Sequence, residues 1–331
     1  MNNFETKIME YVKKVHLDDK LNLKKDFKIE FLAQGEYNIN YILEDNTKKF
    51  VFRINTASQL RLKNQINYEF NALKFIEKST VTPTPIYVDG TKEFFDFGLL
   101  IMNFIKGRPL NYSTDLEIAA DIFSKIHSIN TKDNTELLVE NNILNDRINE
   151  ATWMLEDFFK SSIPDKKLKN FFHNYLNWCN KNLDKEKYFI ENNMQVVNNT
   201  EVNSHNFLID KKSYLIDWEK PVISHPCQDL TQFFADTTTL WRSNYLMTKE
   251  EKDFFIDKYC EKTQFNINDI KESINIYNPY LYLRALSWCA MAFVQYADST
   301  KLIKNEEIFK KIISYLDFSF LEKLLKPYDI I

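Results

Sequence analysis

The stretch Val196–Glu219 constrains the structure and chemistry of this chain more than any other part of the sequence. Two short apolar runs there flank the polar turn Asp210-Lys-Lys-Ser, a pattern that predicts a β-hairpin. Asn206 lies at the entrance of this hairpin and Asp217 at its exit, so we expect the amide and the carboxylate to lie close together. Such oxygen ligands suit Mg²⁺, which usually shares them with substrate phosphates.

Another carboxylate, Glu201, precedes Asn206 by five positions, where it can orient a hydroxyl group for attack on a phosphoryl group. The order Asn199-x-Glu201, Asn206 and a hairpin ending in Asp217 resembles the catalytic segment of the aminoglycoside phosphotransferase and choline kinase family, relatives of the protein kinases. That family has His-x-Asp where this chain has Asn199 and Glu201. Either Glu201 does the work of the family's aspartate from a longer side chain, or the site is impaired.

Length, glycine content and charge limit the possible folds and ligands of this chain. A chain of 331 residues can bury a large core and is expected to form two lobes. With 4 glycines it cannot build a loop that cradles phosphate through a run of glycines, so side chains and ordinary backbone must hold any nucleotide. The net charge is -4 and the lysines alternate with acidic residues, which predicts no nucleic-acid partner.

The cysteines and the apolar segments indicate the compartment. Cys179, Cys227, Cys260 and Cys289 have no paired spacing and are typical of reduced, buried thiols. The N-terminal region lacks the apolar segment of a signal peptide. The longest apolar run, residues 285–294, is about half as long as a membrane span requires. We expect a cytoplasmic protein, monomeric or homodimeric, with no membrane partner.

Hydrophobic periodicity predicts an N-terminal lobe over residues 1–105, built from a five-stranded antiparallel sheet and one main helix. The expected elements are a first helix at 4–16, strands at 28–33, 37–43 and 49–54, a helix at 63–78, and strands at 86–88 and 98–103. The boundary is expected near Lys106-Gly107, where a glycine meets a turn.

Helical patterns dominate the expected C-terminal lobe, residues 106–331. Ser113 is predicted to cap the first helix of this lobe, with Glu117 in its first turns. Further helices are expected over 145–190 and 228–325. Together with the resemblance, this order implies an α+β, bilobal, protein-kinase-like fold.

The resemblance, which covers about residues 28–300, also implies a nucleotide site. Arg53 in the third strand and Glu69 in the following helix are sixteen residues apart, as in the family's pattern, in which the cation holds the α- and β-phosphates and the acid holds the cation. The alternative is a surface ion pair worth at most about 1 kcal/mol, or no pair.

The connector between the lobes is the second part of that implied site. By resemblance, Met102 lies behind the adenine, while the Asn103 carbonyl and the Ile105 amide read its edge. Leu208 and Ile216 on the hairpin complete the residues expected to bind ATP. The alternative is that the connector is simply an edge strand that enters a turn, which would have the same sequence pattern.

Two further matches follow the hairpin. Asp217-Trp218-Glu219 is succeeded by Pro226 and then by Asp229-Leu230, an order that is similar to the family's. We expect Asp229 to be structural, either capping a helix or holding the catalytic loop. His205 is expected to be a solvent-facing loop residue rather than a general base.

The resemblance implies an enzyme that uses ATP and Mg²⁺ to phosphorylate a hydroxyl of a small, amine-bearing substrate such as an aminoglycoside, choline or an amino alcohol. Glu201 is the expected catalytic carboxylate, and Asn206 and Asp217 are the expected metal ligands. The helical lobe is rich in aromatic residues beside acids such as Asp236, which suits an ammonium group. These aromatic residues are Trp241, Tyr245, Tyr282, Trp288 and Phe293. The alternative for most of these aromatic residues is core packing. A plain sugar or nucleoside hydroxyl remains open as the acceptor. The alternative to catalysis is a nucleotide-binding or structural pseudokinase.

Overall fold

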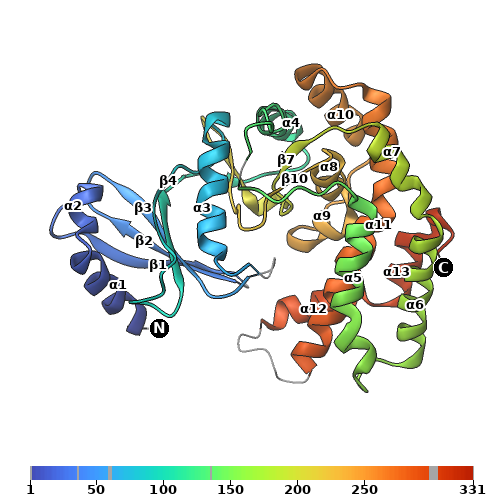
Figure 1. The fold of residues 1–331 in the computed structure, drawn as a ribbon, viewed down its shortest axis with the longest axis horizontal. Coiled ribbons are helices and arrows are strands. Elements are labelled where there is room, and N and C mark those ends of the chain that lie inside the picture. Colours follow the sequence, from blue (N-terminus) through green and yellow to red (C-terminus); the bar gives the residue numbers. More distant parts are fainter. Residues whose placement is uncertain (1, 36, 59–61, 135, 298–304, 331) are drawn as a thin grey trace. The chain divides into compact units, whose positions relative to one another are not determined.

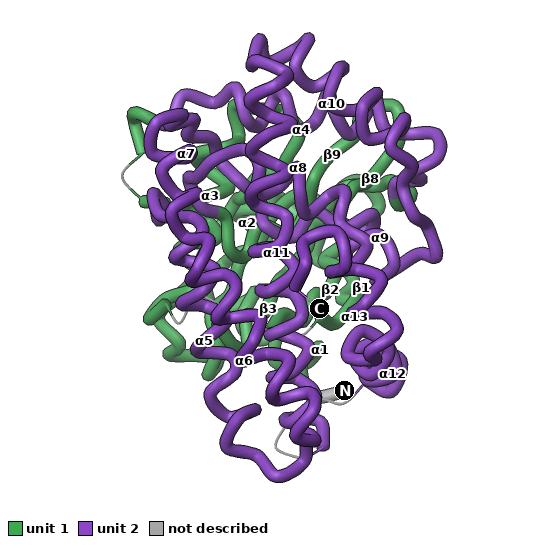
Figure 2. The backbone as a smooth tube through the Cα atoms, turned by 90° about the vertical axis from the view of Figure 1, so that its right-hand side faces the viewer, with its two compact units in different colours: residues 1–109, 132–137, 207–221 green, residues 110–131, 138–206, 222–331 purple. Residues whose placement is uncertain are grey.

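The computed structural model describes residues 2–35, 37–58, 62–134, 136–297 and 305–330. The chain divides into two compact units (Figure 2). The first unit comprises residues 1–109, 132–137 and 207–221, and the second comprises residues 110–131, 138–206 and 222–331. The predicted α+β class is confirmed, because an antiparallel sheet of five strands is combined with many helices (Figure 1). The single lobe boundary near Lys106 stays a prediction.

The first unit is built on an antiparallel sheet in the order β1-β2-β3-β5-β4. The strands are β1 (Lys28–Gln34), β2 (Asn38–Glu44), β3 (Lys49–Asn55), β4 (Pro85–Asp89) and β5 (Gly98–Asn103). The helices are α1 (Asn2–Lys14), α2 (Leu17–Leu21), α3 (Gln65–Ile76) and the 3-10 turn η1 (Glu77–Ser79). All five predicted strands and both predicted helices of this half are therefore present.

The alternation of side chains along β3 places Arg53. Phe52 and Ile54 are fully buried in a core that includes α1 residues such as Tyr11. Successive strand residues point to opposite faces of a sheet, so Arg53 points away from this core. Glu69 of α3, the helix that packs on β4 and β5, receives it on the other face.

The predicted hairpin forms a separate small sheet. β8 (Phe207–Ile209) and β9 (Tyr214–Leu215) pair antiparallel around the expected polar turn, and β6 (Arg108–Pro109) pairs with β8. Gly107 approaches β8 so closely that a Cβ atom there would lie 2.9 Å from the Leu208 carbonyl carbon. This close approach of two backbones explains the glycine at the connector.

The second unit is mainly helical, as expected. Its helices are α4 (Leu116–His127), α5 (Ile143–Lys160), α6 (Lys166–Lys181), α7 (Glu186–Glu191), α8 (Cys227–Phe234), α9 (Asp236–Arg242), α10 (Lys249–Thr263), α11 (Ile267–Ala297), α12 (Glu306–Tyr315) and α13 (Phe318–Leu325). Its short elements are β7 (Val196–Asn198), β10 (Val222–Ser224) and the 3-10 turns η2 (Leu183–Lys185), η3 (Ser204–Asn206) and η4 (Lys326–Tyr328). α5 and α11 pack along each other in its core. None of the described helices is long and apolar enough to cross a membrane.

The predicted cap of α4 is wrong. The helix begins at Leu116 after Asp115, and Glu117 lies in its first turn as expected. Ser113 instead lies in a turn, where its backbone N–H and its hydroxyl donate to Asn111 Oδ1 at 3.0 and 2.8 Å. Asn111 competes for Ser113 because asparagine side chains readily bond to groups two residues further on.

Candidate active site

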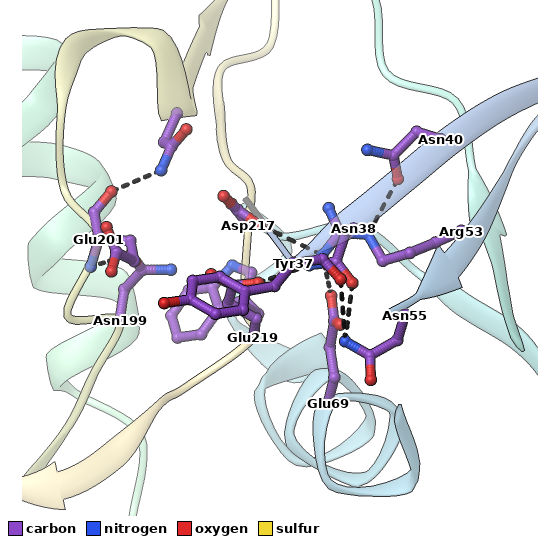
Figure 3. Close-up of polar contacts among 12 residues, drawn as sticks. Tyr37, Asn38, Asn40, Arg53, Asn55, Glu69, Asn199, Glu201, Asp217 and Glu219 are labelled. Carbon is purple, nitrogen blue, oxygen red and sulfur yellow. Dashed lines mark hydrogen bonds and ion pairs between the residues drawn. The ribbon is translucent and has the colours of Figure 1, made fainter. Parts of the chain in front are cut away.

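Arg53 is the centre of the polar cluster of the first unit. Its Nη1 lies 2.5 Å from Glu69 Oε1 and 3.2 Å from Asp217 Oδ1, and its Nε donates to Asn40 Oδ1 at 3.0 Å (Figure 3). The predicted pair of Arg53 and Glu69 is therefore present. It is buried, not a surface pair, since the two side chains are 8% and 1% exposed.

Three acidic residues act on the charge of Arg53 in this cluster. Burial, with a contribution from Asp217, raises the pKa of Glu69 to about 7 against the opposing attraction of Arg53. Burial alone would lower the pKa of Arg53, but Glu69, Asp217 and Glu219 together raise it above its ordinary value. Three acidic side chains thus act on one guanidinium, and of the two that contact it directly, Asp217 is the one that a ligand can reach.

Asp217 lies just after β9 in an unusual backbone conformation. Its φ angle of 65° is left-handed, a region that aspartate tolerates better than most residues. The neighbouring Trp218 is buried and donates its indole N–H to the Leu215 carbonyl at 2.9 Å, which fixes the turn. The Asp217 side chain remains about one third exposed, at 32%, so a ligand can reach it.

Side chains from β2 and α3 hold the segment that follows Asp217. Asn38 Nδ2 donates to Glu219 Oε2 at 2.5 Å, the Gln65 side-chain amide donates to the Glu219 carbonyl, and the Tyr68 hydroxyl donates to the Pro221 carbonyl at 2.5 Å. Asn38 and Glu219 are not among the predicted site residues. The Asp-x-Glu spacing is the signal that points to Glu219, whereas nothing in the sequence pairs it with Asn38.

The connector strand β5 ends in a feature that suits the expected adenine contacts. Thr84 N–H donates to the Asn103 side-chain oxygen at 2.6 Å, while Asn103 N–H donates to the Thr84 carbonyl at 3.1 Å. In an antiparallel pair the first of these bonds would normally reach the backbone carbonyl. Because the Asn103 side chain accepts the Thr84 N–H, the backbone carbonyl of Asn103 does not have to accept it.

The other residues expected to bind the nucleotide lie as follows. Met102 is 5% exposed, and Ile105 lies just beyond the end of β5. Leu208 of β8 and Ile216 after β9 are half-buried. Their roles in binding a nucleotide stay predictions.

In the second unit, Asp229 fixes the loop that carries Glu201. Its two carboxylate oxygens accept the backbone N–H groups of Asn199 at 2.7 Å and Thr200 at 2.8 Å. Asp229 is fully buried at the start of α8, so it has the second of the two structural roles predicted for it and holds the loop of Glu201. Thr200 has a φ angle of 65°, a strained conformation for a β-branched residue that costs on the order of 1–3 kcal/mol. Its bond to Asp229 helps to offset this strain.

Asn199 takes over a positioning role in the same loop, because its Oδ1 accepts the Glu201 N–H at 2.9 Å (Figure 3). Asn206 closes the loop by donating its Nδ2 to the Glu201 carbonyl at 2.6 Å. With its nitrogen bound in this way, Asn206 keeps its amide oxygen as the atom available to a ligand. His205 is exposed, as predicted, and burial together with nearby Arg242 lowers its pKa.

The residues present fit the nucleotide and metal that the resemblance implies. Asp217 offers a reachable carboxylate and Asn206 an oriented amide oxygen, which are hard ligands of the type that Mg²⁺ prefers. Among the described residues no group of three or more His, Cys, Asp or Glu side chains is arranged to hold a metal ion.

The sheet, its buried Arg–Glu pair and the loop fixed by Asp229 define a protein-kinase-like phosphotransferase. The phosphotransferase enzyme family model matches residues 28–261. The chain therefore belongs to this family, whose members transfer a phosphoryl group to a hydroxyl acceptor. No curated protein matches it.

Solved structures show the same fold at low sequence identity. The choline kinase of Streptococcus pneumoniae is 17% identical with a TM-score of 0.60, over 92% of this chain and 100% of that one. The ethanolamine kinase of Plasmodium vivax is 15% identical with a TM-score of 0.67, over 96% and 89%. A spectinomycin phosphotransferase in complex with ADP and spectinomycin is 13% identical with a TM-score of 0.60, over 95% and 98%.

Proposed function

We propose that this phosphotransferase moves the γ-phosphoryl group of ATP to a hydroxyl of a small, amine-bearing acceptor. The observation that carries the proposal is the buried Arg53–Glu69 pair in contact with Asp217. The pair is buried, which fixes the guanidinium in position, and the cluster remains reachable through Asp217, whose side chain is 32% exposed.

In the proposed reaction Arg53 holds the α- and β-phosphates, and Glu69 holds Arg53. Met102, Asn103, Ile105, Leu208 and Ile216 bind the base. Asn206 and Asp217 hold Mg²⁺, which when bound neutralises charge on the phosphates. This metal site rests on the order of the two residues along the hairpin and on the ligand atoms that each offers.

Glu201 is the proposed catalytic carboxylate. Its backbone is fixed at both ends, by Asn199 at its N–H and by Asn206 at its carbonyl, so its side chain projects from a defined point. It accepts a hydrogen bond from the acceptor hydroxyl and takes the proton late in the transfer. Such fixed positioning supplies much of the catalysis in phosphoryl transfer.

The aromatic residues of the second unit bear on the class of the acceptor. Of the aromatic residues expected near it, Tyr282 is buried, Phe293 stacks on Phe309 and Tyr245 stacks on Tyr112, in keeping with core packing. Trp241 and Trp288 are half-buried and meet edge to face at 5.6 Å, so they are the aromatic pair best suited to an ammonium group. The three structural relatives are named for choline, ethanolamine and spectinomycin, which are all amines.

Release of ADP from Mg²⁺ and ATP, measured across choline, ethanolamine, spectinomycin and glycerol, tests the proposal. An amine should be turned over in preference to glycerol, and the Asp217→Ala variant should be inactive with all of them. A thermal-shift assay with Mg²⁺ and ATP comes first, because a ligand at 100 times its dissociation constant stabilises the native state by about 2.7 kcal/mol. Absence of both turnover and a thermal shift would refute the proposal in favour of a structural pseudokinase.

A further inference from the structure

A ladder of alternating charges joins α5 to α11 in the second unit. Arg147 of α5 bonds to Glu140 at 2.5 Å through Nη2 and to Glu150 at 2.9 Å through Nη1. Glu150 in turn accepts Arg284 Nε of α11 with both carboxylate oxygens, each at 3.2 Å. Glu150 contacts both Arg284 and Arg147, so the guanidinium of Arg284 has a fixed position.

The contacts of Arg284 with the described residues lie at one end of its guanidinium. An arginine carries five N–H donors, of which Nε supplies one and the two Nη groups supply four. Within the described part of the chain, both assigned acceptors of Arg284 lie at Nε, and none is assigned to either Nη group. The side chain is 13% exposed, so these donors lie at the edge of the core rather than in open solvent.

Arg284 is related to the loop of Glu201 by its charge and by the packing of α11. Burial alone would lower the pKa of Arg284, but Glu150 raises it above its ordinary value and the carboxylate of Glu201 contributes to the rise. Trp288, one helical turn further along α11, is also half-buried and contacts Trp241 of α9. α9 packs against the η3 turn that contains Asn206. Arg284 and the loop of Glu201 therefore border the same region of the second unit.

We propose that Arg284 binds the acceptor, by donating an Nη–H to a second oxygen next to the hydroxyl that is phosphorylated. The proposal rests on the proposed function, because it takes Glu201 as the residue that receives the reacting hydroxyl. It makes Arg284 a residue that selects acceptors with two neighbouring oxygen functions over amines with one hydroxyl.

The carboxylates near Arg284 indicate whether the second oxygen of the acceptor is charged or neutral. Glu150 already balances Arg284, and an incoming carboxylate would be repelled by Glu201. A neutral hydroxyl avoids both costs. An ammonium next to the reacting hydroxyl would meet the guanidinium, so an amine in the acceptor lies further away, where Trp241 and Trp288 can receive it.

The test compares acceptors and variants in steady-state kinetics. Glucosamine and spectinomycin carry neighbouring oxygen functions, whereas choline and ethanolamine carry one hydroxyl each. Wild-type kcat/KM should be higher for the first pair. Arg284→Met should raise the acceptor KM for that pair by roughly 10- to 100-fold, the effect of losing a hydrogen bond from a charged group. The KM for ATP should not change.

Lys271→Met is the matched control, because it removes a cation from the same helix that pairs with Asp253 of α10. It should leave every kinetic constant near the wild-type value. If Arg284→Met does not fold, Arg284→Lys keeps the charge and one donor group and should raise the acceptor KM by a smaller factor.

Two results overturn the inference while the proposed function stands: a preference of the wild type for choline or ethanolamine, or an unchanged acceptor KM in both Arg284 variants. A wild type that turns over none of the four acceptors and shows no thermal shift with Mg²⁺ and ATP refutes the proposed function, and the role of Arg284 falls with it.

Discussion

Replacement of Glu69 by glutamine should change the stability of the protein in a way that depends on pH. Glu69 is fully buried, and its pKa is raised from an ordinary value of 4.5 to about 7. Below pH 4.5 the carboxyl group is protonated in both the folded and the unfolded chain. As the pH rises towards 7, the unfolded chain releases a proton that the folded chain retains, so the free energy of unfolding falls.

The size of this loss follows from the two pKa values. A shift from 4.5 to about 7 corresponds to roughly 3 kcal/mol, at about 1.4 kcal/mol for each pH unit. The loss levels off about one pH unit above the folded-state pKa of about 7. A neutral glutamine resembles the protonated acid, so Glu69→Gln should match the wild type near pH 4.5 and exceed its stability by up to about 3 kcal/mol near pH 8.

Urea unfolding of both proteins at several pH values between 4.5 and 8 measures this difference. Glu77→Gln is the control, since Glu77 forms an exposed pair with Lys74 and its removal should give a difference that is small and flat with pH. A Glu69→Gln difference that is flat, or that falls as the pH rises, would mean that the attraction of Arg53 outweighs burial and that the charge balance given for the cluster is wrong.

Three further results are expected. Asp217→Ala should abolish the thermal shift produced by Mg²⁺ and ATP while circular dichroism shows an intact fold; a wild-type shift would exclude Asp217 as a metal ligand. Arg53→Ala and Glu69→Ala should each raise the KM for ATP, and the double variant should be little worse than Arg53→Ala alone, because Glu69 acts through Arg53; full additivity would contradict this. Asp229→Asn should lower the free energy of unfolding by about 1–3 kcal/mol, because the Asn199 and Thr200 N–H groups lose a charged acceptor; an unchanged urea midpoint would contradict the role given to Asp229.

Local patterns predicted most of the fold. The alternation in residues 28–54 and the polar turn at Asp210 depend on neighbours in the sequence, and both formed as expected. The cap of α4 failed for the same kind of reason: Asn111 and Asp115 both compete for the backbone of that turn, and the sequence does not rank them. Helix starts with several polar residues are accordingly less predictable than helix interiors.

The candidate site divides in the same way. The Arg53–Glu69 pair follows from a strand, a helix and a fixed spacing, and it is present. The bond between Asn38 and Glu219 joins residues 181 positions apart, and the bond between Arg284 and Glu150 joins residues 134 positions apart. Such partners are chosen by tertiary packing, so no sequence period reveals them.

The most direct test of the central claim is the kcat of Glu201→Gln with an accepted substrate, ATP and Mg²⁺. The variant keeps the shape of the side chain and removes its charge, and the proposed role faces the acceptor rather than the nucleotide. We predict a kcat lower by orders of magnitude, with a nearly unchanged affinity for ATP, and a partial loss of rate in Glu201→Asp. Turnover by Glu201→Gln at the wild-type rate would contradict the assignment of Glu201 as the catalytic carboxylate.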